Sequence, residues 1–308
     1  MQKLKLSLLL SLIVLALPGY AQLGHSNEGT NYSSVGAEDY AKSRHGKDGA
    51  LFLDPYFLPF LTNIKNQTVL DAGCGAGPWS IFAAKNGAQV YGIDIQSRMI
   101  ELANKNAADA GLTVDFRVGS VAQLPYEDNY FDRALSIMVG CNLPQEVFVA
   151  NFTQLYRVLK AGGKLIITAP ATFDAIFADN EQFDKQQVYQ VLQNTQPVPE
   201  DIVSKLATLK DILRATFVIR GNNVVLVEDE KDLTEGEPIW RKIPGLVVPN
   251  FYHSENAYIS QLLKAGFVID RIDRPRFPSR QAWFESSCKL SQEYSYYHPF
   301  VIFHVSKP

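Results

Sequence analysis

A short apolar segment is followed at once by Gly73, Gly75 and Gly77, and then by a stretch that predicts a helix. Because glycine has no Cβ atom, such a loop can turn sharply and let its backbone approach a ligand closely. Dinucleotide-binding loops use the same device with a GxGxxG spacing, whereas these glycines follow GxGxG. The loop is therefore a candidate ligand-binding loop. The alternative is a turn that only packs a helix onto a strand.

Two carboxylates accompany the glycines. Asp71 precedes Gly73 by two positions, and Asp94 closes the next predicted strand. A carboxylate at the end of that strand can accept two hydrogen bonds from ribose hydroxyls. The loop and the acid together favour a ligand that carries a ribose over a turn with a packing role alone.

The elements around this loop alternate between strand and helix. Strands are predicted at 68–72, 88–94, 113–118, 131–138 and 164–168, with helices at 78–85, 97–110 and 146–159. A further helix at 254–265 and strands at 267–272 and 300–305 continue the pattern after an interruption. Such alternation predicts an α/β fold with a parallel sheet covered by helices on both faces.

The interruption spans residues 171–250. It predicts one helix over 180–193 and a second that carries apolar residues at helical spacing over 202–213. A β-hairpin is predicted at 218–227, with its turn at 221–223.

The composition is that of a folded protein. The chain has 308 residues, 46% of them apolar and 11% aromatic, which excludes a disordered chain. At roughly 150 residues per domain, this length allows one large domain or two small ones. The net charge of −3 provides no basic field for nucleic acid, so we expect no nucleic-acid partner. The three cysteines lie far apart and predict neither a disulfide framework nor a metal site.

The N-terminus has the features of a targeting segment. Lys3 and Lys5 precede an apolar stretch at 6–17, and the small residues Gly19 and Ala21 stand at the third and first positions before Gln22. This order predicts a secretory signal peptide at residues 1–21 and a secreted or periplasmic protein. As a helix the apolar stretch rises about 18 Å, short of a hydrocarbon core of about 30 Å. We therefore expect no stable membrane span after cleavage, and the alternative is a membrane anchor at 6–17.

Four segments together resemble the class I S-adenosylmethionine-dependent methyltransferases of the small-molecule type (methyltransferase type 11-like). They are VLDAGCGAG (69–77), YGID (91–94), VGSVAQLPYEDNYFD (118–132) and LYRVLKAGGKLIIT (155–168). The resemblance implies a seven-stranded, mostly parallel Rossmann-like sheet of order 3-2-1-4-5-7-6, with strand 7 antiparallel and a mainly helical lid insert. It divides the chain into a signal peptide (1–21), an N-terminal cap region (22–66), a cofactor-binding half (67–170), a lid insert (171–250) and a C-terminal part (251–308).

The resemblance also implies S-adenosyl-L-methionine as the cofactor and assigns residues to it. The glycine loop faces the methionine and ribose part, Asp94 binds the ribose hydroxyls, and Ile95 packs on the adenine with Met99 nearby. Where relatives carry an acid on the third strand this chain has Ser120, an uncharged acceptor, and Val121 offers a backbone N–H to the ring. The candidate cofactor-binding residues are Tyr40, Asp71, Gly73, Gly75, Gly77, Asp94, Ile95, Met99, Ser120 and Val121.

Methyl transfer requires alignment of a nucleophile with an activated carbon, and it requires a base only if that nucleophile must lose a proton. The end of the fourth strand lies beside the transferred methyl in related enzymes, so Asn142 is a candidate catalytic residue. His45 is a candidate base, and His253 is a candidate catalytic residue that could reach the acceptor from the edge of the lid insert. Each has a structural alternative: a turn-forming side chain for Asn142, and an exposed or packed ring for the two histidines.

The predicted function is methyl transfer to a small-molecule acceptor. The alternative is an exported protein that keeps the fold for binding or signalling without turnover, which the signal peptide and Ser120 favour. A third possibility, a nicotinamide dehydrogenase, conflicts with the glycine spacing. Cys141, Trp240, Phe251 and Tyr252 lie near the predicted acceptor side, and for each of them the alternative is a place in the core.

Overall fold

The computed structural model describes residues 25–26, 29–30, 54–170, 216–220, 223–227, 230–243, 246–275 and 300–308. The predicted signal peptide at 1–21 lies outside the described residues, as do the candidate residues Tyr40 and His45 and the helices predicted at 180–193 and 202–213. Near the N-terminus, two short strands, β1 (His25–Ser26) and β2 (Gly29–Thr30), pair antiparallel. Among the described residues, no helix has the length and apolar character needed to cross a membrane.

In the described part of the chain, the central sheet has seven strands in the order β12-β13-β7-β6-β3-β4-β5. Its parallel ladder joins β3 (Thr68–Ala72), β4 (Gln89–Asp94), β5 (Asp115–Val118), β6 (Phe131–Ile137) and β7 (Leu159–Pro170). Strand β13 (Phe300–Ser306) is antiparallel to both of its neighbours, β7 and β12 (Val268–Asp273). With β3 counted as strand 1, the predicted order 3-2-1-4-5-7-6 and the antiparallel strand 7 are confirmed.

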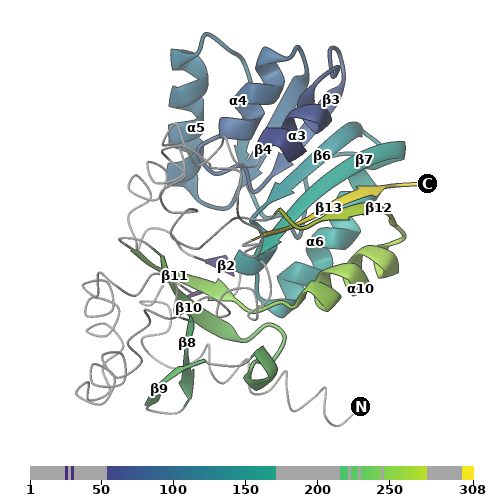
Figure 1. Cartoon of the computed structure of the whole chain (residues 1–308). Coiled ribbons are helices and arrows are strands. Elements are labelled where there is room, and N and C mark those ends of the chain that lie inside the picture. The colour runs from purple at the N-terminus through teal and green to yellow at the C-terminus, as the bar shows by residue number, and fades with distance from the viewer. Residues whose placement is uncertain are drawn as a thin grey trace, which may run out of the picture.

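Helices cover both faces of this sheet (Figure 1). One face carries α3 (Asp54–Leu61), α4 (Pro78–Lys85) and α5 (Ser97–Asp109), and the other carries α6 (Gln145–Val158) and α10 (Glu255–Ala265). The helix ends follow local chemistry. Proline in the first turn of α4 needs no hydrogen-bond partner for its nitrogen, and Ser254 caps α10 by accepting a bond from the Ala257 N–H.

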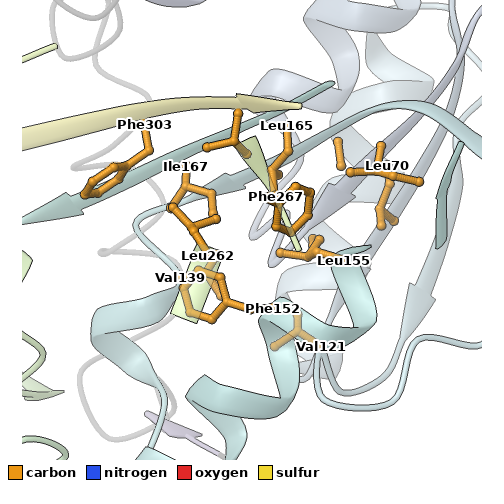
Figure 2. Packing of buried hydrophobic residues seen from close by; sticks show 14 of the residues in the cluster. Leu70, Val121, Val139, Phe152, Leu155, Leu165, Ile167, Leu262, Phe267 and Phe303 are labelled. Carbon is orange, nitrogen blue, oxygen red and sulfur yellow. The ribbon is translucent and has the colours of Figure 1, made fainter. Parts of the chain in front are cut away.

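The larger hydrophobic core lies between the sheet and the α6–α10 face. Figure 2 shows strand residues of this core, such as Leu165 and Ile167, beside Leu155 of α6 and Leu262 of α10. A second core packs Phe57 and Leu61 of α3 against the opposite face. Because both faces are covered, the central strands β3 and β4 are buried at nearly every position, as is typical of a parallel sheet.

Strand β7 begins at Leu159, earlier than the predicted 164–168. The glycines expected to separate helix from strand lie inside it, with Gly162 in the left-handed region at φ 75°. Two backbone hydrogen bonds with Lys307, from Gly162 N–H at 2.8 Å and to Gly163 C=O at 2.9 Å, extend the pairing to the C-terminus. The long strand therefore depends on a partner far away in the sequence.

The described part of the insert is a four-stranded antiparallel sheet of order β11-β10-β8-β9. The predicted hairpin at 218–227 is confirmed as β8 (Thr216–Arg220) and β9 (Asn223–Leu226). Sequence reasoning missed β10 (Pro238–Ile243) and β11 (Leu246–Phe251), whose β-branched residues favour strands. The mainly helical character predicted for the insert is thus not seen in its described residues, and the domain boundary predicted after residue 250 falls within β11.

Candidate functional site

The glycine loop joins β3 to α4 at the edge where the parallel strands end. All three of its glycines have positive φ values: 79° at Gly73, 53° at Gly75 and 81° at Gly77. Residues with a Cβ atom rarely adopt this region, so the loop shape requires glycine. Two backbone N–H groups, of Gly73 and Cys74, donate to the Ile93 carbonyl at 2.7 and 3.0 Å and fix the loop to β4.

The three glycines of the loop differ in the space that surrounds them. A Cβ atom built on Gly73 would lie 2.4 Å from a methyl of Val139, and one on Gly77 would lie 2.7 Å from the Phe116 ring. On Gly75 it would meet no atom within 4 Å. Gly73 and Gly77 therefore permit close packing within the protein, whereas Gly75 borders open space that a ligand could occupy.

Asp94 faces this loop from the end of β4. Its Oδ2 accepts a hydrogen bond of 2.9 Å from Gly75 N–H, and its Oδ1 accepts one of 2.9 Å from Gln96 N–H. A carboxylate offers about four lone-pair sites, so both oxygens retain capacity for ribose hydroxyls. Burial raises the pKa of Asp94, while the two backbone bonds act in the opposite direction.

Asp71 lies deeper, with 2% of its surface exposed. Its Oδ2 accepts a hydrogen bond of 2.6 Å from the hydroxyl of Ser80, a buried residue of α4. Burial raises the pKa of Asp71 to about 6, the Ser80 bonds lower it, and the charge of Asp94 raises it. Sequence reasoning missed Ser80, although a hydroxyl in the first turn of the helix after a glycine loop is a signal that could have indicated it.

The predicted adenine-binding residues surround the ends of β4 and β5. Ile95 is 38% exposed, so its apolar side chain is open to contact with a planar ring. Met99 and Val121 are buried. The Ser120 hydroxyl accepts a hydrogen bond of 3.2 Å from Ala122 N–H and is partly exposed. The Gly119 N–H donates to the Asp94 carbonyl at 2.9 Å, so the turn after β5 is joined to the acid-bearing strand.

A strained turn follows β6 beside the glycine loop. Met138 has a φ of 57°, uncommon for a residue with a side chain. Its N–H donates to Thr168 Oγ1 at 2.8 Å, and its carbonyl accepts from Asn142 Nδ2 at 2.6 Å. Asn142 therefore stabilises the turn through its side chain. Cys141 is buried and donates from its thiol to the same carbonyl, which supports its packing alternative.

The structure places the candidate catalytic residue His253 in a packed environment. Its ring is fully buried and stacks on Phe148, with the ring centres 3.8 Å apart and the planes 6° from parallel. Nε2 lies 2.7 Å from the Leu143 carbonyl, which can only accept, so Nε2 carries the proton in this contact. Nδ1 faces the Glu235 carboxylate at 3.7 Å. The geometry gives His253 a packing role. Trp240, Phe251 and Tyr252 are buried as well, which confirms their core alternative.

The structure thus brings together Asp71, the glycine loop, Asp94 and the residues after β4 and β5 at one edge of the sheet. The turn from Met138 to Asn142 borders this group through Val139. The arrangement holds the buried carboxylate of Asp71, the half-buried carboxylate of Asp94, one open glycine and an exposed apolar side chain. It suits a ligand with a ribose, a cationic group and a flat ring.

Comparisons with known proteins agree with this geometry. Residues 69–163 match a family described as a methyltransferase domain. The chain is 29% identical over 204 residues to 24-methylenesterol C-methyltransferase 2 of Arabidopsis thaliana, covering 65% of this chain and 52% of that protein. It is 35% identical over 127 residues to a ubiquinone biosynthesis O-methyltransferase of Methylocella silvestris, covering 41% of this chain and 47% of that one. The chain spans about half the length of these two relatives.

A solved structure shares the fold. The magnesium protoporphyrin IX methyltransferase of Synechocystis, solved with bound S-adenosylhomocysteine (SAH), superposes with a TM-score of 0.53 at 16% identity. The match covers 90% of this chain and 96% of that chain.

Proposed function

We propose that the protein is a class I S-adenosylmethionine-dependent methyltransferase that transfers a methyl group from S-adenosylmethionine to a small-molecule acceptor, with support from the match of residues 69–163 to a methyltransferase domain. The observation that carries the proposal is the open space at Gly75 beside the Asp94 carboxylate. A Cβ atom there would meet nothing in the protein, so packing does not fill the space beside the carboxylate and a ligand can occupy it.

The residues of the site fit the parts of this cofactor. The free lone pairs of Asp94 are available to the ribose hydroxyls, and Ile95 provides an exposed apolar surface for the adenine. Asp71 lies at the base of the glycine loop, where an ionised carboxylate attracts the ammonium of the methionine part. When bound, the cofactor supplies a methyl group already activated by its positive sulfur. The protein's task is therefore to align the acceptor and exclude water.

Two observations support an acceptor that is a small molecule. The named relatives are a 24-methylenesterol C-methyltransferase and a ubiquinone biosynthesis O-methyltransferase, and both names point to small molecules. The insert places β11 against the turn after β6, which gives the acceptor side a wall of its own. The net charge of −3 disfavours nucleic acid as the acceptor.

The test is calorimetric titration of the purified protein with S-adenosylmethionine and with SAH. We expect a Kd of about 1–100 μM, in the range of ordinary enzyme ligands. Release of SAH in the presence of sterol, quinone or porphyrin acceptors then measures turnover. Binding without turnover on any acceptor would favour a binding protein, and no binding of either ligand would contradict the proposal.

We further propose that the protein is exported. The support is the order of charged, apolar and small residues over 1–21. Expression of the full chain in bacteria, followed by fractionation and N-terminal sequencing, tests this. Export predicts a mature protein in the periplasm or medium that begins at Gln22. An intact N-terminus in the membrane fraction would instead support an anchor at 6–17.

A further inference from the structure

The turn after β6 is held in a shape that its backbone does not prefer. Met138 occupies the left-handed region at φ 57°, and the turn then continues as a short 3-10 helix at Gly140–Asn142. Such strain persists only where surrounding contacts fix it. This turn abuts the glycine loop, because Val139 occupies the space that a side chain at Gly73 would need. The shape of the turn therefore sets one wall of the cofactor site.

The amide of Asn142 is one of the contacts that fix the turn. Its Nδ2 donates to the Met138 carbonyl at 2.6 Å, and its Oδ1 accepts from Asn250 Nδ2 at 2.8 Å. The Asn142 amide can make both hydrogen bonds in this orientation only. If it were reversed, oxygen would face the carbonyl oxygen and one NH₂ group would face another. The donor from Asn250 thus selects the orientation that holds Met138.

Asn250 comes from the insert, 108 residues further along the chain. It lies in β11 and is 6% exposed. A second contact joins the same parts, since the His253 ring just after β11 bonds the Leu143 carbonyl at 2.7 Å. The edge of the insert sheet is therefore in direct polar contact with the turn beside the cofactor site.

We infer that Asn250 is a positioning residue that couples the docking of the insert sheet to cofactor binding, by way of Asn142 and the Met138 turn. The inference takes its ligand from the proposed function. Coupling between two sites is reciprocal. Bound cofactor should therefore strengthen the docking of β11, and weaker docking should lower cofactor affinity.

Calorimetry with SAH tests the coupling in the wild type, N250A, N250D, N142A and the double variant N142A/N250A. We expect N250A to bind SAH about tenfold more weakly, within the usual range of site-to-site coupling. N250D should bind no better, because a carboxylate cannot donate to Asn142. The double variant should be no weaker than N142A alone, since both residues act through one contact.

A control separates this role from a general loss of stability. Val218 is fully buried in the core of the insert sheet, on β8, which β10 separates from the Asn250-bearing strand β11. V218A should lower the thermal stability but keep SAH affinity within about twofold, because distant sites behave independently. Hydrogen exchange adds a second measurement: SAH should slow exchange of the β11 amides in the wild type, and this protection should disappear in N250A.

Each outcome decides the inference. The coupling is overturned if wild type and N250A bind SAH with equal affinity. It is also overturned if V218A and N250A lose SAH affinity equally. Either result leaves the proposed function in place. Failure of the wild type to bind SAH overturns both. The coupling is supported if the Asn250 and Asn142 variants lose SAH affinity, V218A keeps it, and the double variant binds SAH no more weakly than N142A.

Discussion

Oδ2 of Asp94 accepts a hydrogen bond of 2.9 Å from the backbone N–H of Gly75, so the acid predicted to bind a ligand also holds the loop predicted to surround it. The contact spans two strands, because Gly75 follows β3 and Asp94 ends β4. It orders the loop before any ligand arrives. A preordered site binds more tightly, since less conformational entropy is lost on association.

Replacing this acid should therefore affect both binding and stability. In D94N one of the two backbone N–H groups faces an amide NH₂ in place of an oxygen, and the charge is lost. We expect the free energy of unfolding to fall by about 1–3 kcal/mol, and cofactor affinity to fall by more than about tenfold. Chemical denaturation and calorimetry with SAH measure the two effects.

The control for this variant is E101Q, in an exposed ion pair of α5. Exposed pairs contribute about 0–1 kcal/mol, so E101Q should leave both quantities near the wild-type values. Unchanged SAH affinity in D94N would contradict the assignment of Asp94 to the ribose.

The three glycines permit a finer test. In G75A the new methyl enters open space, so the folded protein bears only the backbone strain of a positive φ, about 1–2 kcal/mol. Gly111, at φ 68° and equally open, lies at the end of α5 and provides a matched control. We expect G75A and G111A to lose similar stability, while only G75A loses cofactor binding. Equal SAH affinity in the two variants would show that no ligand occupies the space at Gly75.

The ionisation of Asp71 predicts a pH dependence. Burial raises its pKa from 3.8 to about 6. Because the ionised form attracts the cofactor ammonium, SAH binding should strengthen as the pH rises through about 6. The effect of the same ionisation on the stability of the fold has the opposite sign. The folded protein holds this proton more tightly than the unfolded chain, so the contribution of Asp71 to stability falls as the pH rises from about 4 to about 6.

Calorimetry with SAH checks the predicted pH dependence of binding. The titrations run from about pH 5 to about pH 8, a range that brackets the shifted pKa of about 6. S80A removes a hydrogen bond that lowers the pKa of Asp71, so it should move the midpoint to higher pH. D71N should abolish the dependence, whereas D109N, at an exposed surface pair, should keep it. A dependence that persists in D71N would assign the titration to another group.

Much of the fold could be predicted from local sequence, because glycine positions and apolar runs determine where each buried strand ends. The same reasoning located Asp94, whose place at the end of a strand follows from sequence alone. It could not find Asn250, since a contact across 108 residues depends on how the insert docks. It also could not assign His253, because a histidine in an aromatic stretch has the same sequence pattern in a core as in an active site.

That last ambiguity can be resolved by exchanging the His253 ring. Phenylalanine preserves the stack on Phe148 but loses the bond to the Leu143 carbonyl. H253F should therefore cost about 1–2 kcal/mol of stability, while H253A should cost about 3–4 kcal/mol because a buried cavity is added. If the ring only packs, H253F keeps the rate of SAH formation on the acceptor within about threefold, at all pH values where the protein is folded. A fall in kcat of about 100-fold or more, in an H253F protein that still binds SAH normally, would instead show that the ring takes part in proton transfer.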